Sequence, residues 1–158
     1  MNQLDAALTV IDSIRKALEA EVERAQRERA LIRTMDVDGL VQRANLRATF
    51  NDYVRGLQRD LSTALAAAGA ALGLKEVTVA SLGAVLPGPA AQLDDGLAAV
   101  RSLAAALAEL DELNRILGQR ALSYVRAYLG VLNPTPSAYT RRGSSTGIWQ
   151  SRTVSRVA

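Results

Sequence analysis

Three long segments of this chain repeat an apolar residue every three or four positions, and this spacing limits the fold more than any other feature. Such spacing lines one face of an α-helix, whereas a half-buried strand needs strict alternation. The three series are Leu4, Leu8, Ile11, Ile14, Leu18, Val22 and Ala25; Leu40, Ala44, Arg47, Phe50, Val54, Leu57, Leu61, Leu65, Ala68 and Leu72; and Leu93, Leu97, Val100, Leu103, Leu107, Leu110, Leu113, Leu117, Ala121, Tyr124, Tyr128 and Val131. The sequence predicts an all-α fold with three long antiparallel helices.

A turn signal separates the first two series. Asp36–Gly39 contains two aspartates and a glycine, which favour turns and N-caps, so a second helix of about 35 residues is predicted to start near Asp38. Two such helices joined by a short turn form an antiparallel hairpin. Arg47 interrupts the apolar series of the second helix without an evident explanation. The charged stretch 19–30 of the first helix is interpreted as a solvated face with weak salt bridges.

The connection to the third long helix contains a short helix. Gly73 is predicted to end the second helix, and Thr78 to cap a short helix over Val79–Leu86. A Pro-Gly-Pro sequence then stops that helix, and Pro89 suits the first turn of the third long helix.

The composition narrows the function. Aromatic residues make up only 4% of the chain, which favours closely packed helices over a β-sandwich. The chain has no cysteine and no histidine, so disulfides, cysteine nucleophiles, imidazole catalysis and zinc sites with these ligands are excluded. It also lacks a phosphate-binding loop and carboxylates at metal-ligand spacing. We therefore predict a binding protein rather than an enzyme, without a cofactor or metal.

Charge is distributed unevenly along the chain. Residues 1–112 hold 12 basic and 16 acidic side chains, a net charge of −4, whereas residues 113–158 hold seven arginines and no carboxylate, a net charge of +7. An acidic partner is expected for the C-terminal region. Nucleic-acid binding and membrane attachment are weaker alternatives, because the arginines are sparse and no helix-turn-helix pattern precedes them. Without a signal-peptide pattern or an apolar run of about 20 residues, the cytoplasm is the expected location.

The end of the third helix carries a wider apolar stripe than the rest. From Leu117 onward a second apolar set joins the first, and it consists of Leu122, Val125, Leu129 and Leu132. Such a stripe is either covered by other helices or is a docking surface for a partner helix. Residues 1–132 are predicted to form one helical domain. Residues 133–158, rich in Pro, Ser, Thr, Gly and Arg, are predicted to form a flexible basic tail.

Three segments of the chain match a known family pattern. They are the turn Met35–Leu40, the threonine-led stretch Val77–Leu82, and the helix Leu110–Leu132 with the following Ala138–Gly143. In these segments the chain resembles the FlgN family of flagellar export chaperones. The resemblance implies a cytosolic chaperone that binds helical end segments of hook-associated proteins and delivers them to the flagellar type III export gate.

The resemblance and the residue pattern together assign candidate contacts. The predicted partner-binding residues are Leu113, Asn114, Leu117, Arg120, Leu122, Val125, Arg126, Leu129 and Leu132. Of these, Arg120 and Arg126 are predicted to lie on the rim of the contact. Tyr139, which matches the family's loop tyrosine, is predicted to contact the export gate. The alternative is a coiled-coil scaffold that self-associates through its third long helix, and a homodimer also stays open.

Overall fold

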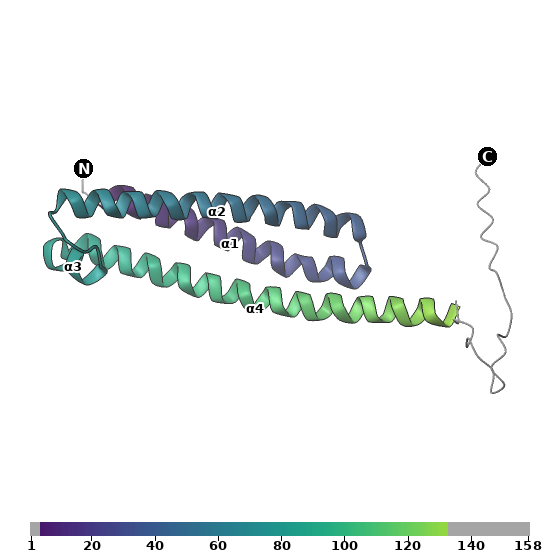
Figure 1. The fold of residues 1–158 in the computed structure, drawn as a ribbon. Helices are drawn as coiled ribbons and strands as arrows, with labels where there is room; N and C mark the ends of the chain where they lie inside the picture. Colours follow the sequence, from purple (N-terminus) through teal and green to yellow (C-terminus); the bar gives the residue numbers. More distant parts are fainter. Residues whose placement is uncertain (1–3, 133–158) are drawn as a thin grey trace, which may run out of the picture. The chain divides into compact units, whose positions relative to one another are not determined.

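A computed structural model describes residues 4–132, and these form four α-helices without a β-strand (Figure 1). The helices are α1 (Asp5–Thr34), α2 (Val37–Ala71), α3 (Val79–Val85) and α4 (Pro87–Leu132). The predicted all-α class is confirmed for this part of the chain. The predicted flexible tail, including Tyr139, lies outside the described residues.

The turn between α1 and α2 is short because both helix ends are capped locally. Met35 adopts the left-handed conformation with φ 53°, which lets the N–H groups of Met35 and Asp36 bond to the carbonyls of Ile32 and Leu31. The Asp36 carboxylate accepts a hydrogen bond from the Gly39 N–H at 2.9 Å. Asp36 is therefore the N-cap, and α2 begins at Val37, slightly earlier than the predicted start near Asp38.

The connection from α2 to α4 follows the predicted order of elements. Gly73 adopts φ 68° just after α2, and Thr78 caps α3 in a reciprocal pair with Ser81. The third long helix, α4, starts at Pro87 rather than at the predicted Pro89. Both prolines fit there because the first-turn N–H groups of a helix have no intrahelical acceptor, so none is lost.

The chain divides into two compact parts between Ala121 and Leu122, within α4. In the first part, α1, α2, α3 and the beginning of α4 share an apolar core. One cluster contains Leu4, Ala7, Ile11, Ala68, Leu82, Ala90 and Leu93, and a second contains Ile14, Leu18, Ala25 and Leu107. The apolar series identified in the sequence supply these core residues except Ala7, Leu82 and Ala90.

Side-chain contacts in the first part define the directions of its long helices. Contacts between α1 and α4 join Ile11 to Gly96 and Ala25 to Asn114, so these two helices run in the same direction. The short turn and the packing of α1 on α2 make α2 antiparallel to α1. Gly96 permits the close approach of α1 and α4, because a Cβ atom there would lie 2.7 Å from the Ile11 Cγ2 atom.

Candidate partner-binding surface

A buried carboxylate lies at the centre of the first part. Glu21 on α1 is fully buried, and arginines from two helices surround its carboxylate. Arg43 Nη2 and Arg47 Nη1, both on α2, donate to Glu21 Oε1 at 2.6 and 3.0 Å. Arg24 Nη1 donates to Glu21 Oε2 at 3.1 Å. Charge-assisted hydrogen bonds thus compensate for the loss of water around this buried charge.

Arg47 extends these contacts to α4, and Arg43 makes a second contact with α1. Arg47 donates to both carboxylate oxygens of Asp111, one of them at 3.2 Å. Its guanidinium also lies 5.5 Å from the centre of the Phe50 ring. The Arg43 Nε atom lies 3.1 Å from a carboxylate oxygen of Glu28. Arg47, which interrupts the apolar series of α2, therefore links α2 to both α1 and α4.

Asn114 is part of this interior and not of the exposed face of α4. It is 5% exposed, and its Nδ2 donates to the Ala25 carbonyl at 2.8 Å. Its Oδ1 accepts a hydrogen bond from Arg29 Nε at 3.4 Å. We use the name polar layer for Glu21, Arg43, Arg47, Asp111 and Asn114.

The interpretation of residues 19–30 as a solvated face was wrong for Glu21, which is fully buried. Glu21 lies between Leu18 and Ala25 at helical spacing, and Arg47 interrupts the facing series of α2. Opposite charges at stripe positions of two adjacent helices were the signal that sequence reasoning missed.

The pKa of the Glu21 carboxyl reflects two opposing effects. Burial by itself raises this pKa, but hydrogen bonds from Arg43, Arg24 and Arg47 lower it, and the net result lies below the ordinary glutamate value. Glu21 is therefore ionised at neutral pH despite its burial.

The predicted partner-binding residues of the first part differ in exposure. Leu113 is about half exposed, Leu117 is half-buried, and Arg120 is exposed. Asn114, as described above, is turned inward. Three of these four residues therefore have surface on the outside of the bundle.

The second part begins with the last helical residues, Leu122–Leu132, which we name the α4 end. Every residue of the α4 end is exposed, including all of its large apolar side chains. Their exposed fractions range from 38% for Val125 to 78% for Val131. They are Leu122, Tyr124, Val125, Tyr128, Leu129, Val131 and Leu132. A contiguous apolar surface of this kind is typical of an interaction site.

Charge at the α4 end has one sign. Arg126 is exposed there, and the sequence contains no carboxylate from Leu113 to Leu132. Five of the predicted partner contacts are thus exposed residues of one helical segment, namely Leu122, Val125, Arg126, Leu129 and Leu132. This segment combines apolar side chains with positive charge, which suits an amphipathic partner with acidic residues.

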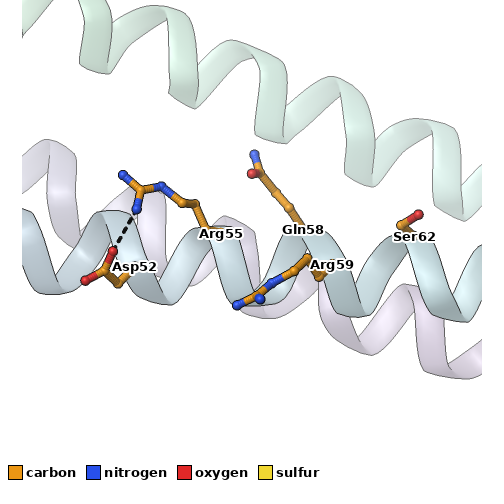
Figure 2. Close-up of a pocket in the computed structure, with 5 residues that line it drawn as sticks. All are labelled: Asp52, Arg55, Gln58, Arg59 and Ser62. Carbon is orange, nitrogen blue, oxygen red and sulfur yellow. Dashed lines mark hydrogen bonds and ion pairs between the residues drawn. The ribbon is translucent and has the colours of Figure 1, made fainter.

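The depression drawn in Figure 2 does not have the features of a substrate site. Its lining residues Asp52, Arg55, Gln58, Arg59 and Ser62 all come from α2. Asp52 and Arg55 form an ion pair at 2.9 Å while both side chains stay largely exposed. A surface ion pair on one helix does not form the concave, enclosed site that a small substrate needs.

The comparison with protein families decides the class of protein. The FlgN family, described as FlgN protein, matches residues 1–147. The chain belongs to the FlgN family. FlgN proteins are chaperones in flagellum biogenesis, and the family is not one of known enzymes. No curated protein and no solved structure matches the chain.

Within residues 4–132, no group of three or more Asp, Glu, His or Cys side chains could hold a metal ion. None of the helices in this range is long and apolar enough to cross a membrane. The exposed apolar surface of the α4 end is the candidate partner-binding site of this FlgN family member.

Proposed function

We propose that this FlgN family member is a cytoplasmic chaperone whose α4 end binds a helical terminal segment of a flagellar hook-associated protein. The exposure of the whole apolar set of the α4 end carries this proposal. An amphipathic client helix would cover this surface and keep its own apolar face from premature assembly. Leu113, Leu117 and Arg120, which precede the α4 end in the same helix, are also proposed to contact the client.

Charge supports the choice of client. Arg120 and Arg126 are exposed cations on a helical stretch without carboxylates, so a client helix with acidic residues beside its apolar stripe is favoured. Asn114 has a supporting role in this proposal, since its side chain holds α4 against α1. Delivery of the client to the type III export gate, with Tyr139 in contact with the gate, completes the proposed function.

Self-association is the second candidate function. The same exposed apolar side chains of the α4 end could pack against a second copy of the chain, as a homodimer or as a coiled-coil scaffold. The two candidates differ in what happens without a client. A scaffold stays assembled on dilution, whereas a chaperone does not depend on its own oligomer.

Co-purification with the C-terminal segments of hook-associated proteins from the same genome tests the proposal. Replacing Val125 and Leu129 by glutamate should abolish binding while leaving helicity unchanged, because both side chains are exposed. Val37→Glu with Val41→Glu is the matched control, since these residues are exposed at the same spacing on α2. Normal binding by the α4 variant would refute the proposed surface. No binding by the unaltered protein, together with an oligomer that survives dilution, would favour the scaffold.

A further inference from the structure

The apolar side chains of the α4 end fall into two rows. At about 100° per residue, Leu122, Val125, Leu129 and Leu132 share one face of the helix. Tyr124, Tyr128 and Val131 share a second face, roughly 110° away from the first. Both rows are exposed, so about half of the circumference of the α4 end is apolar.

A single partner helix is too narrow for this surface. One helix packs its side chains against a stripe of about 100° on its neighbour, which corresponds to one row. The first part of the chain offers an internal standard. There α4 contacts two helices at once, because Asn114 bonds to α1 and Asp111 binds Arg47 of α2. Two apolar rows at the α4 end require two covering helices in the same way.

Each row has an arginine beside it. Arg126 lies about 80° from the centre of the first row by helical spacing, beside Leu122 and Leu129. Arg120 precedes Tyr124 of the second row by one turn. The second row also carries two phenolic hydroxyls, which need hydrogen-bond partners once they are covered.

We infer that the client covers the α4 end with two amphipathic helices, one on each row, and that each helix places acidic residues beside an arginine. This inference rests on the proposed function and defines the architecture of the client. The helix on the row of Tyr124 and Tyr128 also supplies hydrogen-bond acceptors for the two hydroxyls. The bound α4 end is then the third helix of a small bundle whose other two helices come from the client.

Cross-linking from adjacent positions tests this arrangement directly. A benzophenone-bearing amino acid is placed in the full-length protein at Tyr128 or at Leu129, which belong to different rows. The probe is the hook-associated C-terminal segment that co-purifies with the chaperone. We expect the two positions to cross-link to two different helical stretches of the client. Cross-links from both positions to one stretch, or to a second copy of the chaperone, would overturn the inference.

Affinity measurements provide an independent test. The dissociation constant is measured for the whole client segment and for each of its helical stretches as a separate peptide. The whole segment should bind at least about 100-fold more tightly than either peptide, because its second helix binds intramolecularly. Two double variants, one for each row, should each weaken binding of the whole segment at least about tenfold. They are Tyr124→Ala with Tyr128→Ala, and Leu122→Ala with Leu129→Ala.

The outcomes separate this inference from the proposed function. If one peptide binds as tightly as the whole segment and the tyrosine variant binds normally, one helix covers one row and the inference is wrong, while the chaperone function stands. If the whole segment does not bind the unaltered protein, the proposed function fails and the inference fails with it.

Discussion

The polar layer and the α4 end invert the usual distribution of side chains in opposite ways. In the polar layer, the first part of the chain encloses Glu21 and Arg43, two charged residues that proteins normally leave in water. In the α4 end, Tyr128, Val131 and Leu132 are more than half exposed, although such residues are normally covered. Neither arrangement is the most stable choice for an isolated helical bundle.

The difference between the two regions lies in what completes each of them. The charges of the polar layer find their partners within the chain, since Glu21 receives hydrogen bonds from three arginines. The apolar side chains of the α4 end have no such cover among the described residues of the second part, all of which are exposed. Changes in the polar layer should therefore affect folding, whereas changes in the α4 end should affect binding.

The largest effect is expected for Glu21→Gln. The variant removes the buried carboxylate from Arg43 and leaves this buried guanidinium with Glu28 as its ionic partner, so the free energy of unfolding should fall by about 3–5 kcal/mol. Urea unfolding followed by circular dichroism at 222 nm measures this change. An unfolding free energy within about 0.5 kcal/mol of the unaltered protein would show that the polar layer contributes little to stability.

The double variant Glu21→Leu with Arg43→Leu is the control for this experiment. It removes both buried charges and should recover most of the lost stability, because apolar side chains can replace a buried ion pair. Arg47 keeps Asp111 as its partner in this variant.

A matched pair of leucines on α4 gives the next effect. Leu107 is 5% exposed in the bundle and Leu129 is 52% exposed in the α4 end. Leu107→Ala should lower the free energy of unfolding by about 3 kcal/mol, because it leaves a cavity. Leu129→Ala should change it by less than about 0.5 kcal/mol and weaken client binding about tenfold. Thermal unfolding and a binding titration on both variants test the comparison, and equal losses of stability would break it.

Asn114 distinguishes the two regions at a single position. Asn114→Ala removes the hydrogen bond to the Ala25 carbonyl and should lower the free energy of unfolding by about 1 kcal/mol. Client binding should be unchanged at temperatures where the variant is folded. The neighbouring Leu113→Ala is the control, with the opposite expectation of unchanged stability and weaker binding. Lost binding by Asn114→Ala at full stability would make Asn114 a client contact, as the sequence pattern suggested.

The sequence predicted the helices well because their signals are local. The apolar spacing, the cap at Thr78 and the glycine after α2 each act within a few residues, and the structure places all of them in their predicted roles. The start of α4 was predicted at Pro89, since a proline pair was interpreted as a break. In fact, the first turn of a helix accommodates prolines at Pro87 and Pro89.

The polar layer was not predicted because its signal depends on contacts between distant residues. Arg47 could be recognised as an interruption, but its partners Glu21 and Asp111 are 26 and 64 residues away. A solvated face and a buried ion pair have the same charges, and only the packing of α1 on α2 distinguishes them. For the α4 end, the sequence predicted an apolar stripe and left open whether other helices cover it. Leu122 and Leu129 are exposed, so none of the described helices covers this stripe.

Acid should weaken the polar layer before it affects the α4 end. The pKa of Glu21 lies below its ordinary value in the folded protein, so the unfolded chain binds a proton more readily. The stabilisation by Glu21 is therefore fully present at pH values above the ordinary glutamate pKa of about 4.3. It is lost as the pH falls through the lower pKa of the folded state. Glu28 and Asp111, which bind the same arginines, are the other carboxylates that face this cluster.

The measurement is urea unfolding of the client-free protein between pH 7 and pH 3. The unaltered protein should lose stability below the ordinary glutamate range, and Glu21→Leu with Arg43→Leu should show a flatter profile because both buried charges are gone. The α4 end has no carboxylate. Any loss of client binding at a pH above the ordinary glutamate pKa should therefore result from protonation of carboxylates of the client. Parallel acid profiles for the two proteins would assign the acid sensitivity to other ion pairs, such as those of Asp12 and Glu112, whose pKa values are also lowered by hydrogen bonds from Lys16 and Arg115.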